Sequence, residues 1–164
     1  MNGAASHSFR FSTDVRAVVQ RVTRAAARVG DRVTGQIGPG LVVFVGVARQ
    51  DSAIDVTYVA AKIRDMRVFA GDAGKPMDRS VVQSGGSVLV VSQFTLYGDM
   101  RKGRRPSFED AAAPVDARVW YEALVRELRA SGMTVETGEF QAMMHVELVN
   151  DGPVTILIDS TKQF

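Results

Sequence analysis

The sequence predicts an α/β protein, a single compact domain of mixed β-sheets forming a barrel-like core with two outer helices. Segments with strand character outnumber the helical ones, and sheets closed against each other bury such strands well. Two segments, Leu41–Val47 and the first half of Ser87–Leu96, are unbroken apolar runs, which is typical of strands buried on both faces. A chain of 164 residues, 46% of them hydrophobic, can bury roughly two-thirds of its unfolded surface in one domain.

The chain is expected to divide into an N-terminal extension and one folded domain. Residues 1–14 are rich in Ser and Ala and lack the apolar stretch of a secretory signal, so we expect a disordered extension followed by a domain over residues 15–164. A hairpin is expected around Gly30-Asp31, which supplies turn chemistry. Strands are expected at Arg16–Val22, Ala25–Val29, Arg32–Ile37, Leu41–Val47, Met66–Phe69, Ser87–Leu96, Met133–Thr137, His145–Val149 and Val154–Ile158.

Two helices are expected between these strands. Ser52 can cap the first helix, with Asp55 three residues later and apolar residues following at helical spacing. Pro114 is a good first-turn residue for the second helix, and Gly132 is a good stop. Met77–Gln83 shows little regular pattern and is expected to be irregular.

The composition excludes several kinds of active site. There is no cysteine, so thiolate nucleophiles, disulfides and Cys-based metal sites are absent together. The only histidines are His7 and His145, so no His-rich metal site is expected, and only His145 could be a catalytic histidine. No cofactor is expected. The lack of cysteine is compatible with the reducing cytoplasm, where we expect the protein to act.

Charge is unevenly distributed along the chain. Residues 1–50 carry seven Arg against two acidic residues, whereas residues 106–164 carry four basic against ten acidic residues. Such asymmetry favours a polyanionic partner such as nucleic acid, although a solvated surface has the same composition. No apolar run approaches the ~20 residues of a membrane span, so no membrane partner is expected.

Neutral polar residues end the second apolar strand, and they form the first candidate site. Ser92, Gln93 and Thr95 are interleaved with Phe94 at a position where buried polar groups must find partners. They could bind a substrate, while backbone amides at a strand end stabilise an oxyanion. A hydroxyl nucleophile needs a base, and the sequence offers none nearby. The alternative is that these side chains cap the neighbouring backbone.

Three further segments are candidates. Gly152-Pro153 is a turn in which a cis bond would present carbonyl oxygens to a pocket, although trans is the default. Phe140 and Met144 could stack on a base or pack in the core. The densest basic cluster follows the polar strand end in a Gly/Pro loop that could hold phosphates or be merely solvated. Its basic residues are Arg101, Lys102, Arg104 and Arg105.

Five segments carry a further signal, in order and nearly without gaps: Arg16–Ala25, Ile37–Leu41, Val90–Leu96, Arg104–Phe108 and Leu148–Thr155. The combination of Ser-Gln-Phe-Thr with Asn-x-Gly-Pro-Val-Thr is specific. From about Arg16 to Ile158 the chain resembles the D-aminoacyl-tRNA deacylase family (the D-tyrosyl-tRNA deacylases).

The resemblance implies an enzyme, a homodimer that hydrolyses the ester of D-aminoacyl-tRNA, and of glycyl-tRNA(Ala), at the 3′-terminal ribose. It implies that Gly152-Pro153 is cis and enters the active site of the other subunit, where its carbonyls exclude an L side chain. Ser92 and the backbone of Gln93 and Phe94 are implied to hold the substrate carbonyl.

The resemblance casts Thr95 as a nucleophile, but a pocket without a base argues against this role. Water assisted by the terminal 2′-OH of the RNA is the better interpretation, and it makes RNA, not DNA, the required substrate. Phe140 and Met144 match positions near the terminal adenosine, whereas Met143 and His145 replace an acid and a Gln that are common in the family. Two other hypotheses remain open at this point. One is a non-catalytic tRNA-binding dimer, and the other is a hydrolase of small D-amino-acid esters.

Overall fold

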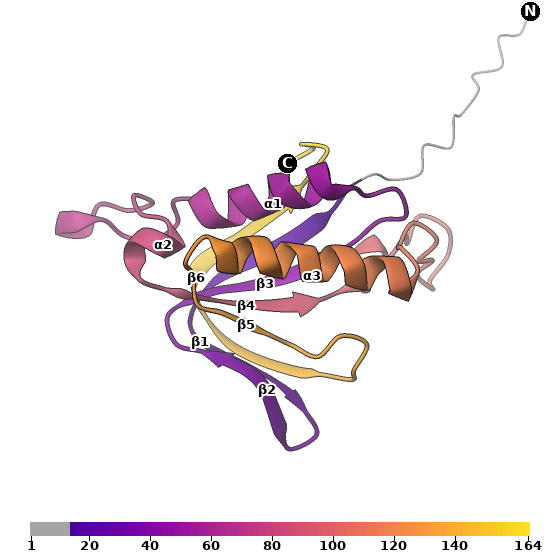
Figure 1. Cartoon of the computed structure of the whole chain (residues 1–164), viewed down its shortest axis with the longest axis horizontal. Helices are drawn as coiled ribbons and strands as arrows, with labels where there is room; N and C mark the ends of the chain where they lie inside the picture. The colour runs from indigo at the N-terminus through magenta and orange to yellow at the C-terminus, as the bar shows by residue number, and fades with distance from the viewer. Residues whose placement is uncertain (1–13) are drawn as a thin grey trace, which may run out of the picture.

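The computed structural model describes residues 14–164, which form one six-stranded mixed sheet with helices packed against it (Figure 1). Its strands are β1 (Arg16–Val29), β2 (Arg32–Ile37), β3 (Gly40–Gly46), β4 (Ser87–Ser92), β5 (Val135–Thr137) and β6 (His145–Asp159). β1 pairs antiparallel with β2, β3 and β6, whereas β3 pairs parallel with β4 and β4 pairs parallel with β5. The two long strands, β1 and β6, therefore carry much of the sheet.

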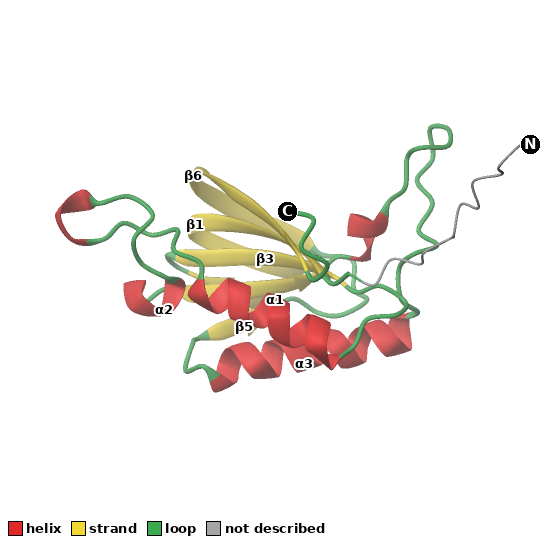
Figure 2. Ribbon diagram, turned by 90° about the horizontal axis from the view of Figure 1, so that it is seen from above, coloured by secondary structure: helices red, strands yellow, loops and turns green. Residues whose placement is uncertain are grey.

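The helical segments are α1 (Ala53–Asp65), α2 (Val81–Ser84), α3 (Pro114–Ala130) and the 3₁₀ turns Asp72–Gly74 and Phe94–Tyr97. α1 begins as expected, because the Ser52 amide donates to the Asp55 carboxylate at 2.9 Å. α1 and α3 lie side by side on one face of the sheet (Figures 1 and 2). The apolar stripes of both helices form the main core with the sheet, through residues such as Val59, Ile63, Leu124 and Leu128.

A second, smaller core lies on the opposite face, inside the curl of the sheet. It contains Val22, Val42, Leu89 and Val91, all at most 1% exposed. The curl brings β2 against β5, where a Cβ on Gly35 would lie 2.5 Å from the Thr137 carbonyl oxygen. A side chain at this position would prevent the close approach, so the barrel-like shape depends on this glycine.

The structure confirms the α/β class and the barrel-like core and corrects the details. The expected separate sheets are one sheet. The expected strands Arg16–Val22 and Ala25–Val29 are one continuous strand, because register shifts between Gln20 and Arg24 let β1 bend without ending. His145–Val149 and Val154–Ile158 likewise belong to β6.

Two local expectations were also wrong. Met66–Phe69 is not a strand, since only Phe69 forms an isolated bridge, to Arg79. The segment expected to be irregular, Met77–Gln83, contains the start of α2, whose short helix is capped by the Ser80 side chain. Of the expected N-terminal extension, residues 1–13 lie outside the described residues, and Asp14 is buried at 2% exposed.

Candidate active site

A cavity of about 780 Å³ opens where β3 and β4 end, between the start of α3 and the loop of residues 138–144. It holds all four residues of the predicted catalytic segment, Ser92, Gln93, Phe94 and Thr95, and both predicted adenosine-side residues, Phe140 and Met144. None of the residues that line it, in the part of the chain that the structure describes, has an ionisable side chain. The cavity can therefore bind and polarise a substrate, but its own side chains offer no acid or base.

The predicted catalytic segment, Ser92–Thr95, follows β4 and turns into the cavity. The Gln93 amide donates to the Val45 carbonyl at 2.7 Å, so the sheet already uses it. The next two amides, of Phe94 and Thr95, open the 3₁₀ turn Phe94–Tyr97 and have no backbone acceptor among residues 14–164. They are the amides that this segment leaves for a ligand oxygen.

Thr95 is not arranged as a nucleophile. Its hydroxyl oxygen accepts a hydrogen bond from the Gln93 side-chain amide. No carboxylate or imidazole contacts it within the described chain. His145, the one histidine that could have served, is exposed, pairs across strands with Arg28 and does not line the cavity.

The opposite wall is aromatic. Phe140 packs on Tyr121 with ring centroids 5.6 Å apart, and the Tyr121 hydroxyl donates to the Val90 carbonyl in β4 at 3.0 Å. Phe94 and Phe108 form an edge-to-face pair at 5.1 Å. These contacts tie the cavity walls to the centre of the sheet.

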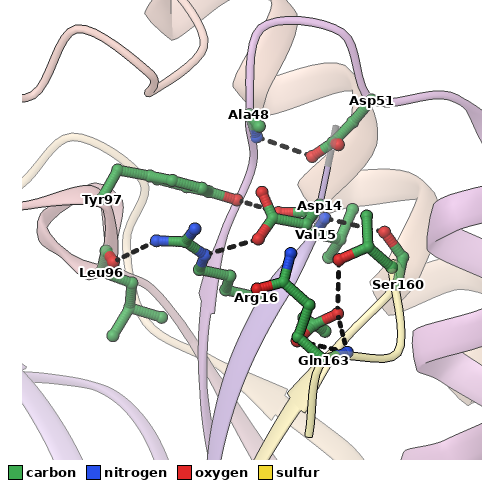
Figure 3. Close-up of polar contacts among 11 residues, drawn as sticks. Asp14, Val15, Arg16, Ala48, Asp51, Leu96, Tyr97, Ser160 and Gln163 are labelled. Carbon is green, nitrogen blue, oxygen red and sulfur yellow. Dashed lines mark hydrogen bonds and ion pairs between the residues drawn. The ribbon is translucent and has the colours of Figure 1, made fainter. Parts of the chain in front are cut away.

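Buried Asp14 and Asp51 and the partly exposed Arg16 lie near Tyr97 of the 3₁₀ turn (Figure 3), and none of these three residues lines the cavity. The Tyr97 hydroxyl donates to the Asp14 carbonyl at 2.6 Å, and Arg16 donates to the Leu96 carbonyl at 3.2 Å and to the Asp14 carboxylate at 2.7 Å. Asp51 accepts from the Ala48 amide at 2.6 Å.

Burial raises the pKa of two carboxyls in this cluster. The pKa of Asp51 rises to about 7 and that of Asp14 also rises, chiefly because both are desolvated. One oxygen of each, Oδ1, has no hydrogen-bond partner. Burial likewise raises the pKa of Tyr97. The ionisable groups near the site therefore belong to its support and not to its surface.

The predicted Gly152-Pro153 element lies elsewhere in the same chain. Gln20 pairs with Thr155 and Val22 with Asn150, so residues 151–154 project from β6 as a bulge. The bond between Gly152 and Pro153 is cis, as the resemblance implies. Both residues are exposed, and neither lines the cavity of its own chain.

Side chains at its base hold this bulge. Arg21 Nε donates to the Asp151 carbonyl at 3.1 Å and lies 3.0 Å from the Asp151 carboxylate. The Asn150 side-chain amide donates to the carbonyl oxygens of Arg21 and Val154 at 3.0 and 3.1 Å. The bulge is thus a fixed projection.

The predicted basic loop is exposed and follows the 3₁₀ turn. Arg101 is paired with Asp99 at 2.7 Å, and this contact lowers the pKa of Asp99 to about 2. Lys102, Arg104 and Arg105 make no ion pair within residues 14–164. Three of the four predicted RNA-binding cations are therefore uncompensated.

Sequence reasoning missed part of the cavity. Phe108 belonged to a recognised segment but received no role, and the start of α3, with Pro114 and Ala117, also lines the cavity. Gly46 was missed as well. A Cβ there would lie 2.7 Å from the Tyr97 ring and 3.1 Å from the Gln93 carbonyl oxygen. A glycine at the end of an apolar strand was the available signal.

The fold and the cavity together define the class of protein. It is a mixed-sheet α/β domain with a neutral, partly apolar cavity at the end of the central strand β4. The sequence model described as D-Tyr-tRNA(Tyr) deacylase matches residues 18–159. The chain belongs to this family, whose members are hydrolases that act on ester bonds.

Individual relatives support the same family assignment. A D-aminoacyl-tRNA deacylase of Symbiobacterium thermophilum is 59% identical over 150 residues, covering 92% of this chain and 99% of the relative. That of Koribacter versatilis is 56% identical over 150 residues, covering 92% and 100%.

Among solved structures, "c-Myc DNA Unwinding Element Binding Protein" superposes with a TM-score of 0.83 at 37% identity, covering 87% of this chain and 97% of that one. A probable eukaryotic D-amino acid tRNA deacylase superposes with a TM-score of 0.76 at 18% identity, covering 89% and 99%, and supports the fold alone. No helix in the described residues is long and apolar enough to cross a membrane.

Proposed function

We propose that the protein hydrolyses the ester of D-aminoacyl-tRNA, and of glycyl-tRNA(Ala), to free amino acid and tRNA. The observation that carries the proposal is the neutral cavity at the end of β4, lined by hydroxyl, amide and apolar groups. A site without an acid or base suits a substrate that supplies part of its own chemistry. An aminoacyl ester next to a ribose 2′-OH is such a substrate.

In this mechanism the catalytic segment binds the ester carbonyl. Water adds to the carbonyl carbon, helped by the 2′-OH, and the negative charge that develops on oxygen is stabilised by Ser92 and the free amides of Phe94 and Thr95. The bond between the carbonyl carbon and the ribose 3′-oxygen then breaks, and that oxygen takes a proton. Gln93 acts through its side chain, which fixes Thr95. Phe140 and Met144 form the apolar wall for the terminal adenosine.

Chirality is read by a second copy of the chain. The bulge with Gly152 and Pro153 is exposed and does not reach its own cavity, so a homodimer can insert it into the other subunit's site. There its carbonyl oxygens leave no room for an L side chain, whereas a D side chain or glycine fits. β6 pairs only with β1 in the described sheet, so its outer edge is open to a partner.

The RNA partner is bound mainly through its phosphates. Lys102, Arg104 and Arg105 have uncompensated charge on a loop that directly follows the catalytic turn. We infer a cytoplasmic enzyme that needs no cofactor and does not act on DNA or at a membrane.

The proposal is tested by incubating purified protein with D-Tyr-tRNA and L-Tyr-tRNA. Hydrolysis of the D ester with the L ester spared is expected. Salt-sensitive binding of both without turnover would contradict the proposal and favour a non-catalytic tRNA-binding dimer. Equal rates on a free D-tyrosine ester and on charged tRNA would instead indicate a hydrolase of small esters.

Asn150→Ala tests the chirality element. The variant removes both hydrogen bonds that the Asn150 side chain donates at the base of the bulge. The ratio of D to L hydrolysis rates is expected to fall by about tenfold or more, because a displaced exclusion element no longer blocks the L side chain. Gln36→Ala, on the exposed surface of β2, is the control and should keep the wild-type ratio. An unchanged ratio in Asn150→Ala would contradict the assignment.

A further inference from the structure

The loop that forms the aromatic wall is held only weakly by the backbone. Residues 138–144 connect β5 to β6, and the Gly138 amide donates to the Val90 carbonyl at 3.0 Å. Beyond that, the Ala142 amide donates to the Glu139 carbonyl at 3.2 Å. Gln141 lies in the left-handed region at φ 63°, which is unfavourable for a residue with a side chain. Side chains must therefore fix the tip of this loop.

One side chain outside the loop contacts its tip at two places. The guanidinium of Arg118, on α3, lies 4.6 Å from the centroid of the Phe140 ring. Its Nη2 donates to the Gln141 side-chain oxygen at 3.4 Å. Phe140 is thus contacted by two residues of α3, Arg118 and Tyr121, and the Tyr121 hydroxyl donates to β4.

Other contacts leave Arg118 available for this task. Its ion pair with Glu122 is long, at 3.9 Å, and both side chains are about half exposed, at 48% and 52%. Such a pair contributes little. On the far side of the loop, Arg32 pairs with Glu139, which fixes the neighbouring residue but does not contact the aromatic ring. Arg118 and Tyr121 therefore both contact the Phe140 ring, and Arg118 also contacts Gln141.

We propose that Arg118 is a positioning residue of the active site, which holds Phe140 and Gln141 in place and thereby fixes the width of the cavity on the side that takes the terminal adenosine. This inference rests on the proposed function for its substrate. Arg118 touches the wall and not the reacting ester. Its loss is expected to weaken binding of the tRNA end and to leave the chemical step intact.

The experiment compares Arg118→Met, Arg118→Lys and the control Glu122→Gln on D-Tyr-tRNA. Arg118→Met keeps the apolar stem but loses the charge over the ring and the hydrogen bond. KM is expected to rise about fivefold with kcat changed less than about twofold, as loss of uniform binding predicts. Arg118→Lys should recover part of the loss, because an ammonium also binds an aromatic face. Glu122→Gln should match the wild type.

Amide hydrogen exchange of the same variants measures how firmly the loop of residues 138–144 is held, and it does not depend on hydrolysis of a substrate. Exchange of the two hydrogen-bonded amides within residues 139–143, those of Glu139 and Ala142, is expected to be about fivefold faster in Arg118→Met and unchanged in Glu122→Gln. A wild-type KM and unchanged exchange in Arg118→Met would overturn the proposal, as would a fall in kcat at constant KM. If the wild type fails to hydrolyse D-Tyr-tRNA, the proposed function fails, and the exchange rates alone decide whether Arg118 positions the loop.

Discussion

The two sides of the turn Phe94–Tyr97 are opposite in character. Its front faces a cavity with no ionisable side chain among the described residues, whereas at its back the Tyr97 hydroxyl donates to the main-chain carbonyl of buried Asp14 and the Leu96 carbonyl accepts from Arg16. The same short segment thus has a neutral cavity on one side and a cluster of charged residues on the other. The difference indicates that pH should act on the stability of this fold through the back of the turn, and on catalysis only through water and the substrate.

The largest effect on stability and activity is expected from a substitution of Gly46, which lines the cavity and lies close to Tyr97. Gly46→Ala places a Cβ 2.7 Å from the Tyr97 ring and 3.1 Å from the Gln93 carbonyl oxygen, so the turn must shift. Overpacking of this kind costs ~1–3 kcal/mol in the free energy of unfolding, and a displaced turn should lose at least about tenfold in kcat/KM.

Gly38→Ala is the matched control for this change. It also lies at the end of a strand, but an added Cβ there meets nothing within 4 Å. Denaturant unfolding and D-Tyr-tRNA hydrolysis are measured for both. Equal behaviour of the two variants would show that the turn is not packed as tightly as described.

A smaller effect is expected from Asp51, which should change the free energy of unfolding and leave catalysis unchanged. The pKa of Asp51 is about 7 in the folded protein and close to 3.9 in an unfolded chain. The folded state therefore binds a proton that the unfolded state has lost between about pH 4 and pH 7, so stability falls as pH rises through this range and is level above it.

Asp51→Asn removes this dependence while its oxygen can still accept from the Ala48 amide. The variant should be more stable than the wild type by on the order of 2 kcal/mol at pH 8, and the difference should disappear at pH 4. Urea unfolding at both pH values measures it. A parallel change in kcat would contradict the separation of front from back.

The smallest effect is expected at Thr95. Thr95→Ala removes a hydroxyl that has no base, so kcat should fall by less than about tenfold, the upper value of one neutral hydrogen bond. Loss of a true nucleophile costs about 10⁴-fold or more. Single-turnover hydrolysis of D-Tyr-tRNA distinguishes the two results, and a loss of the second size would make Thr95 the attacking group.

Local sequence patterns predicted the central strands and the starts of the two long helices, but not how strands distant in the sequence pair with each other. The apolar runs predicted β3 and β4, and the Ser52 cap and Pro114 predicted where α1 and α3 start. The bends in β1 could not be predicted, because they depend on partners at the far end of the chain. The polar run Ser92–Thr95 predicted a site. The hydrogen bond from the Gln93 amide to the Val45 carbonyl could not be predicted, because it depends on the pairing of β4 with β3 and no local sequence pattern indicates it.

The pairing of β1 with β6 also has a consequence for how the protein is made. Arg16 lies opposite Asp159, so β1 must wait for the synthesis of β6 before this open edge is covered. Contacts so distant in sequence slow folding and expose an unpaired strand during synthesis. The edge of β1 that β6 covers therefore stays open until β6 has been synthesised, and chaperone capture of the nascent chain should act on β1.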